Sequence, residues 1–159
     1  MERANRILNH NLFLKHMHLN DEAEADRCFC LHNMNHFLDV ARISMILNLK
    51  ENLCISPDII YAAALLHDIG RHVQYENGTS HELASAEIAP SILKDCGFDN
   101  KETGVIIDAI SHHRAISEGE SQLSRILYQA DKASRPCFAC KVEKDCNWKK
   151  EKKNLQIKW

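Results

Sequence analysis

The chain contains no run in which apolar and polar residues alternate over the length of a β-strand. Such alternation marks a half-buried strand, whereas apolar residues that recur every three or four positions mark a helix. Only five glycines and three prolines interrupt the 159 residues, and residues that favour helices fill the stretches between them. The sequence therefore predicts an all-α protein, and its length suits a single domain.

Capping signals indicate where the helices begin. Ser56 followed by Pro57 fits a helix start, and Asp21 three residues before Glu24 resembles a capping box. We expect helices at residues 3–18, 22–50 (with a break near Cys30 left open), 57–68, 80–95, 100–113 and 121–134, and a short one at 147–155.

Histidine and aspartate residues occupy the apolar faces of several predicted helices. His36, for example, precedes Val40 by four positions and Ile43 by seven, which places all three on one face. An inward carboxylate without a partner is costly to bury, so several inward His and Asp residues indicate a shared cation. Imidazole with carboxylate suits Fe, Mn, Zn, Ni or Co better than Ca. The candidate ligands of this kind are His36, His67, Asp68 and Asp131.

Two further histidine positions have the same character. His81 precedes Ala84 at helical spacing, and His113 follows Ile110, with His112 directly beside it. A single inward histidine is more often a hydrogen-bonded core residue than a metal ligand. The complete ordered set favours metal binding.

Three stretches carry a family resemblance: HFLDVARI (residues 36–43), AALLHDIGR (63–71) and ILYQADKASRP (126–136). They resemble the HD superfamily of metal-dependent phosphohydrolases, in which the pattern H…HD…D lies on a helical bundle. The resemblance implies a single-domain HD-type helical bundle over residues 1–136, with its core at 30–136. It also implies one or two divalent transition-metal ions.

The middle of the chain narrows this resemblance. HELASAEIAPSIL (81–93) and AISHHR (109–114) look like the bacterial branch that includes symmetrical diadenosine tetraphosphate hydrolases. In that branch six ligands hold two metal ions, usually with iron present. His81 matches the fourth ligand and His113 the fifth, with His112 as the alternative. The chain departs from this branch after Asp131, where a cysteine cluster follows instead of the usual acid-proline ending.

The resemblance implies hydrolysis by metal-activated water. A transition metal lowers the pKa of bound water toward neutrality, and Asp68 would bridge two ions and orient the attacking water. Arg71, Lys132 and Arg135 are candidate phosphate contacts, with Arg71 and Asp68 the candidate catalytic residues. The three cations could equally be ordinary surface charges.

A second cluster of metal-type residues follows the last candidate ligand. Cys137, Cys140 and Cys146 form C-x2-C-x5-C, a spacing that suits zinc or an iron–sulfur cluster if a fourth ligand is supplied. Cys30 or Cys28 could supply it. The alternative is a set of ordinary reduced thiols, as expected in a reducing compartment.

Charge and hydropathy limit the partners. The formal net charge is −2, but residues 137–159 hold seven lysines and three acids, so this Cys/Lys-rich stretch is expected to be a basic extension. We find neither a membrane-length apolar run nor a signal peptide, and we expect a cytoplasmic protein.

The expected partner is a small phosphorylated substrate, a nucleotide first, rather than nucleic acid or a membrane, and a homodimer is left open. The alternatives are a phosphodiesterase, a deoxynucleotide 5′-phosphatase, or a non-catalytic scaffold with a partner-binding or redox module at the cysteines.

Overall fold

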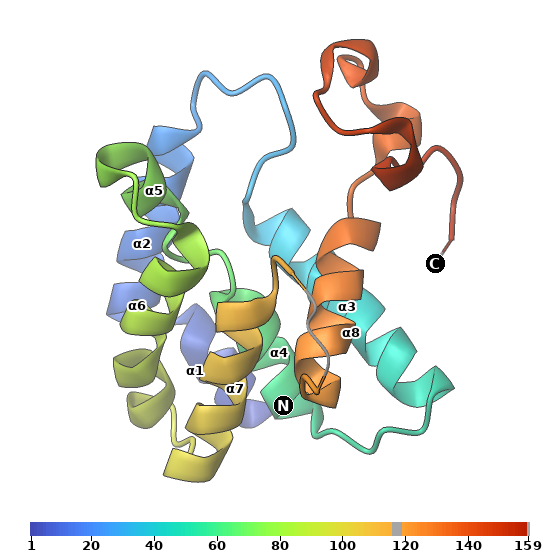
Figure 1. The fold of residues 1–159 in the computed structure, drawn as a ribbon. Coiled ribbons are helices and arrows are strands. Elements are labelled where there is room, and N and C mark those ends of the chain that lie inside the picture. Colours follow the sequence, from blue (N-terminus) through green and yellow to red (C-terminus); the bar gives the residue numbers. More distant parts are fainter. Residues whose placement is uncertain (116–118, 159) are drawn as a thin grey trace.

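Every regular element of the protein is a helix in residues 1–115 and 119–158, the part that the computed structural model describes, so the all-α prediction is confirmed. Figure 1 shows the bundle. Its helices are α1 (Glu2–Leu8), α2 (Asn11–Ala23), α3 (Met34–Lys50), α4 (Pro57–Leu66), α5 (Arg71–Asn77), α6 (His81–Asp95), α7 (Asn100–His112) and α8 (Gln122–Ala133). Three short 3-10 turns follow: η1 (Cys137–Ala139), η2 (Glu143–Asp145) and η3 (Lys150–Lys152).

Helix α4 is the central element of the bundle. It contacts α1, α3, α6, α7 and α8, and its side chains from Ala62 to Leu66 are all buried. The sequence explains this position, because a helix that is apolar on every side has no face to offer to water. Pro57 occupies its first turn, where a missing N–H costs nothing.

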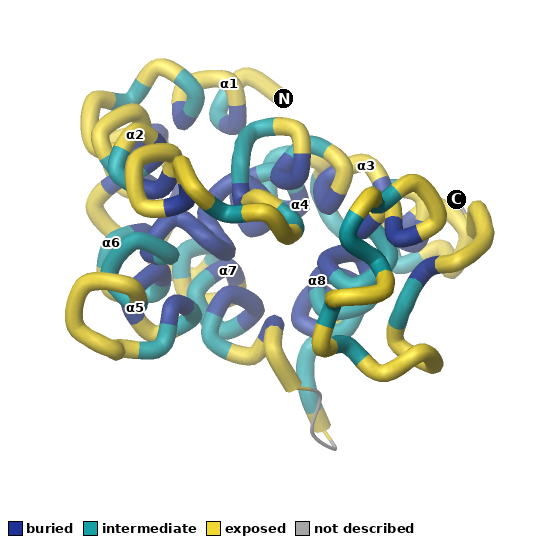
Figure 2. The backbone as a smooth tube through the Cα atoms, turned by 90° about the horizontal axis from the view of Figure 1, so that it is seen from above, coloured by how far each residue is buried: buried dark blue, intermediate teal, exposed yellow. Residues whose placement is uncertain are grey.

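The surrounding helices pack in pairs, α3 with α8, α8 with α7, and α7 with α6. In Figure 2 their buried residues face inward and their exposed residues face outward. In Figure 1 the beginnings of α3 and α6 and the ends of α4, α7 and α8 lie toward the same end of the bundle. Residues placed at these helix ends can therefore meet.

Two of the predicted helices are wrong in their bounds. The one expected at 3–18 is split, because the side chain of His10 caps α2 by accepting a hydrogen bond from the Leu12 N–H at 3.2 Å. The one expected at 22–50 begins only at Met34, and the break left open near Cys30 is present. Asp21 and Glu24 close α2 instead of opening a helix, and residues 24–33 form an irregular loop.

Two further differences concern short elements. Helix α5 was not predicted, because none of its residues is buried and so its sequence has no apolar face to detect. The helix expected at 147–155 is reduced to the single turn η3. The helices predicted at 57–68, 80–95, 100–113 and 121–134 correspond to α4, α6, α7 and α8 within two residues at each end.

Residues 137–158, named here the C-terminal extension, fold back onto the end of α8. The Asn154 side chain donates hydrogen bonds to the carbonyls of Lys132 (2.7 Å) and Arg135 (3.1 Å). The Lys132 carbonyl lies in the last turn of α8, where carbonyls lack a partner within the helix, so Asn154 satisfies it. The Arg135 carbonyl also accepts from the Cys137 N–H at 2.9 Å. In the described part of the chain, none of the helices has the length and apolar character needed to cross a membrane. The predicted domain boundary at residue 136 stays a prediction.

Candidate metal centre

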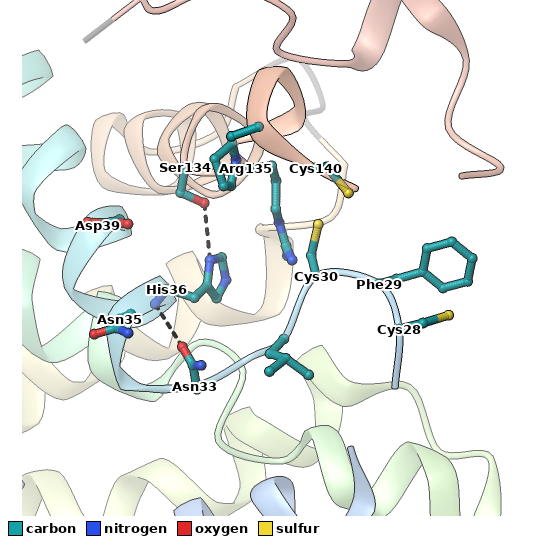
Figure 3. A pocket seen from close by; sticks show the side chains of 13 residues that line it. Cys28, Phe29, Cys30, Asn33, Asn35, His36, Asp39, Ser134, Arg135 and Cys140 are labelled. Atoms are coloured by element: carbon teal, nitrogen blue, oxygen red, sulfur yellow. Dashed lines mark hydrogen bonds between the residues drawn. The ribbon is translucent and has the colours of Figure 1, made fainter. Parts of the chain in front are cut away.

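One group of potential ligands joins three helices. His36 stands in the first turn of α3, His67 and Asp68 follow the last residue of α4, and Asp131 lies in the last turn of α8. One ligand atom from each of the four lies within 4.8 Å of the others, and all four residues are buried. Asn33 fixes the start of α3 by accepting a hydrogen bond from the His36 N–H, visible in Figure 3.

The distances within this first group are short. His67 Nε2 lies 3.2 Å from Asp68 Oδ2, and His36 Nε2 lies 3.6 Å from the same oxygen. His36 Nε2 is also 3.4 Å from Asp131 Oδ1. Both Nε2 atoms are buried without a hydrogen-bond partner in the described part of the chain.

A second group lies on the other oxygen of Asp68. His81, the first residue of α6, and His113, directly after α7, place their Nε2 atoms 3.1 and 3.4 Å from Asp68 Oδ1. The two Nε2 atoms are 3.2 Å apart. Asp68 Oδ1 is likewise buried without a hydrogen bond among the described residues. Asp68 therefore belongs to both ligand groups, one through each oxygen.

The hydrogen bond made by Nδ1 of each of these histidines determines which ring nitrogen carries the proton. Nδ1 of His67 lies 2.7 Å from the Ala64 carbonyl, and Nδ1 of His113 lies 2.7 Å from the Ile110 carbonyl. A carbonyl only accepts, so Nδ1 is protonated and Nε2 presents a lone pair. The same pattern orients metal-binding histidines in proteins.

His36 and His81 are held in the same way by side chains. The Ser134 hydroxyl lies 3.1 Å from His36 Nδ1 and donates to the Asp131 carbonyl, so it is left to accept from the imidazole (Figure 3). Gln74 Oε1 lies 2.6 Å from His81 Nδ1.

The residues present therefore fit a cation. Nitrogen lone pairs and carboxylate oxygens, all acceptors, face one another at 3.1–3.6 Å around Asp68. Without a positive charge between them, such contacts are repulsive and leave buried polar atoms unsatisfied. Transition metals prefer this combination of imidazole and carboxylate.

Electrostatics favours the metal-binding protonation states. Burial raises the pKa of the Asp68 carboxyl, but the surrounding imidazoles, His67 first, outweigh burial and hold that pKa well below its usual range. Asp131 is shifted in the same direction: burial is again opposed, here first by the adjacent His36 imidazole and then by the charge of Arg135. Burial lowers the pKa of His81 to about 3. At neutral pH the carboxylates are ionised and His81 is neutral, which are the forms that ligate metals.

The two adjacent histidines of the predicted set are placed differently. His113 is 1% exposed and belongs to the second group. His112 is about half exposed, points away from Asp68, and directs Nδ1 to the Asp108 carbonyl at 2.8 Å. The structure brings His113, and not His112, to the candidate centre.

The three candidate phosphate contacts all lie at the centre. Lys132 Nζ is 2.6 Å from Asp131 Oδ2, and an Nη of Arg135 is 3.1 Å from Asp131 Oδ1. Arg135 is buried, and its Nε has no hydrogen-bond partner in the described part of the chain. Arg71 Nη1 lies 2.6 Å from His81 Nδ1.

Sequence reasoning missed a buried pair beside the centre. The helix predicted at 22–50 would place His32 one turn before His36, but His32 lies in the loop 24–33. Its Nδ1 is 2.5 Å from Glu24 Oε1, and its N–H donates to Glu24 Oε2 at 2.7 Å. His32 Nε2 faces Asp68 Oδ2 at 3.8 Å. No periodic signal could have revealed the pair, because the loop is irregular.

A cavity of about 320 Å³ adjoins the first group. His36, Ser134 and Arg135 form one part of its lining, and Cys30 and Cys140 form another (Figure 3). Among the described residues, no three cysteine sulfurs lie within 4.8 Å of one another. The compact four-thiol group expected for Cys30, Cys137, Cys140 and Cys146 is therefore not assembled at the spacing of a single ion.

Comparisons with known proteins find an uncharacterized relative, several ribonucleases Y and one protein-family model. The chain is 45% identical over 157 residues to an uncharacterized protein of Clostridium beijerinckii, with 99% of both chains covered. It is 34% identical over 103 residues to ribonuclease Y of Mycoplasma mycoides subsp. mycoides, covering 64% of this chain and 18% of the ribonuclease. Ribonuclease Y of Enterococcus faecalis is 30% identical over 123 residues, 77% of this chain and 22% of the ribonuclease.

The chain thus spans only about a fifth of the ribonucleases that it matches. No solved structure gives a significant match. The model of the HD domain family matches residues 33–135, which hold all six residues of the two ligand groups. The chain belongs to the HD domain family.

Proposed function

We propose that the protein hydrolyses a phosphate ester or anhydride of a small nucleotide at a two-metal centre. His36, His67, Asp68 and Asp131 would hold one ion, and Asp68, His81 and His113 the other. The observation that carries the proposal is the position of Asp68, whose two oxygens each face a separate group of buried ligand atoms. Three of these atoms, His36 Nε2, His67 Nε2 and Asp68 Oδ1, are without a hydrogen-bond partner among the described residues.

The bound metal supplies water of lowered pKa and positive charge for a phosphoryl oxygen. The chain supplies the rest. Asp68, buried between the two groups, orients the attacking water through its carboxylate. Ser134 and Gln74 hold the outer nitrogens of His36 and His81, so that the donor atoms need no reorganisation when substrate binds.

Arg135 is the best-supported phosphate contact. It is buried, it lines the cavity next to His36, and its Nε donor has no partner among the described residues. A phosphate oxygen in the cavity would satisfy that donor. Arg71, which lies next to His81, is the candidate phosphate contact beside the second ligand group. When His81 Nδ1 is protonated toward Gln74, it has no lone pair for Arg71, whose Nη1 then keeps only a long 3.4 Å contact to Gln74 Oε1 and could turn to an anion.

The cavity volume is at the lower end of the range for small-molecule sites. We therefore favour a nucleotide over a large polymer. The resemblance to symmetrical diadenosine tetraphosphate hydrolases stays a prediction, and this dinucleotide belongs in the substrate panel.

The test is a hydrolysis screen on protein supplied with Mn²⁺, Fe²⁺ or Co²⁺, using nucleoside mono-, di- and triphosphates and dinucleotide polyphosphates. His113→Gln should abolish turnover, and its neighbour His112→Gln should leave turnover within about twofold. The proposal fails if no substrate turns over with any metal, or if both variants keep wild-type rates.

A second candidate is cleavage of RNA phosphodiester bonds, favoured by the identity of about a third shared with ribonuclease Y over 103 residues. Short single-stranded RNA in the same screen separates the two. Faster metal-dependent cleavage of RNA than of every nucleotide would replace the first candidate.

A further inference from the structure

Five of the seven cysteines lie on two segments outside the helical core. Cys28 and Cys30 stand on the loop 24–33, and Cys137, Cys140 and Cys146 stand on the C-terminal extension. All are free thiols. In Figure 3, Cys30 and Cys140 point toward each other from opposite sides of the cavity, whereas Cys28 points outward. The hydrolase proposal assigns no role to them.

Local backbone geometry places two thiols of the extension on the same side of one turn. Cys137 begins the 3-10 turn η1, and the N–H of Cys140 donates to the Cys137 carbonyl at 3.2 Å. Side chains three residues apart on such a turn lie on the same side. Cys146 directly follows the next turn, η2, with its N–H bonded to the Glu143 carbonyl at 3.3 Å.

Two cations lie near these cysteines. Lys153, whose side chain is 8% exposed, donates to the carbonyl (2.6 Å) and carboxylate (2.8 Å) of Glu143. Hydrogen bonding to Glu143 raises the pKa of Lys153, and the nearby Cys146 and Cys137 add to this. On the other side, the buried Arg135 lines the same cavity as Cys30 and Cys140 (Figure 3).

Positive charge near the cysteines favours the thiolate form, in which sulfur binds a metal. Four thiolates around a zinc ion or a [4Fe–4S]²⁺ cluster carry two net negative charges, which are costly to bury unless cations lie nearby. Lys153, near Cys137 and Cys146, and Arg135, which shares a cavity lining with Cys30 and Cys140, supply such positive charge.

The extension also lacks a core of its own. Among its described residues only Cys137 and Asn154 are buried, and its regular structure is limited to three-residue turns. So small a buried surface does not order a segment of this length. Metal binding commonly provides the missing free energy in such segments.

We propose that Cys30, Cys137, Cys140 and Cys146 bind a thiolate-coordinated metal centre, either zinc or an iron–sulfur cluster, that fastens the extension to the loop 24–33. Each thiol releases its proton to solvent as its sulfur binds. Tetrahedral zinc with bonds of about 2.3 Å holds its sulfurs about 3.8 Å apart. No three thiols in the described part of the chain lie within 4.8 Å. Zinc binding therefore requires the segments to close, and a cluster, which spaces its ligands more widely, requires less closure.

The experiment reads out sulfur ligation directly, so it does not depend on hydrolase activity. The full chain is stripped of metal anaerobically and divided. One part is titrated with Co²⁺ and then Zn²⁺, and the other is reconstituted with Fe²⁺ and sulfide. Intense thiolate-to-cobalt absorption that Zn²⁺ abolishes identifies a zinc-type site. A brown chromophore with acid-labile sulfide bound to the protein identifies a cluster. The His/Asp centre gives neither signal, because it has no sulfur ligand.

Variants locate the site. Cys137→Ser with Cys140→Ser, or Cys30→Ser alone, should remove most of the sulfur-to-metal absorption, and the exposed Cys54→Ser is the matched control that should retain it. Circular dichroism and the metal content of the His/Asp centre check that each variant is folded. The proposal is overturned if wild-type protein gives no sulfur-to-metal absorption with either probe. It is also overturned if folded variants lacking Cys30, or Cys137 and Cys140, absorb as strongly as Cys54→Ser.

Discussion

Substituting Gly70 by alanine should push helix α6, which carries His81, away from the His67-Asp68 turn of the metal centre. Gly70 follows the His67-Asp68 pair, and its backbone runs directly against α6. An added Cβ would lie 2.6 Å from the Ser85 backbone nitrogen and 2.7 Å from the Ala84 carbonyl carbon. These are backbone atoms near the start of α6, so no side-chain rotation relieves the clash.

The contacts around Gly70 set the size of the expected loss of stability. Ordinary Cβ contacts begin near 3.4 Å, so α6 must retreat by about 0.8 Å. Overpacking of this kind costs about 1–3 kcal/mol, and loss of the 2.9 Å hydrogen bond from the Gly70 N–H to Ser85 Oγ adds about 1 kcal/mol. We expect a fall in the free energy of unfolding of about 2–4 kcal/mol, and in Tm of roughly 10 °C. Because α6 carries His81, the 3.1 Å approach of His81 Nε2 to Asp68 Oδ1 is also lost.

Urea denaturation and metal titration measure both effects. Gly104→Ala is the control: it lies in α7, nothing stands within 4 Å of its added Cβ, and removing a helical glycine should stabilise by about 0.5–1 kcal/mol. If Gly70→Ala is as stable as wild type and binds as much metal, the close packing of α6 against the His67-Asp68 turn does not shape the centre.

Two further predictions concern groups that support the site. Burial raises the pKa of Glu24, but hydrogen bonding to His32 outweighs it and lowers that pKa from 4.5 to about 2. The depressed pKa stabilises the fold fully above pH 4.5, and this contribution, roughly 2–3 kcal/mol, is lost as the pH falls toward 2. Between pH 4.5 and 2, the free energy of unfolding of Glu24→Gln should fall less steeply with falling pH than that of wild type. An unchanged slope would contradict the pairing. Asn154→Ala removes two hydrogen bonds, to the carbonyls of Lys132 and Arg135 at and just after the end of α8, and should lower the free energy of unfolding by about 1–2 kcal/mol. The rate of amide hydrogen exchange should rise only in residues 132–158. A rise spread over the whole chain would refute the local role.

Much of the centre could be predicted from sequence, because its ligands occupy apolar helix faces. His36, His81 and Asp131 lie on helices with regular apolar spacing, and His67-Asp68 ends a helix that is apolar throughout. The choice between His112 and His113 could not be made, because adjacent residues at a helix end differ only in how the last turn closes.

The rest of the site depends on tertiary contacts. The loop 24–33 contains neither glycine nor proline, so the sequence left a break near Cys30 open but could not give the extent of the loop. It is held open by Glu24, which binds both the backbone and the ring of His32 and accepts a 2.8 Å hydrogen bond from Tyr75 on α5. Helix α5 itself buries no residue, and so it gave no periodic pattern.

The central claim is that Asp68 joins two metal ions, and anomalous diffraction from crystals grown with Mn²⁺ tests it most directly. We predict two anomalous peaks, one beside each oxygen of Asp68. The first should be bounded by His36, His67 and Asp131, and the second by His81 and His113. A single peak, or no peak within bonding distance of Asp68, would contradict the two-metal account.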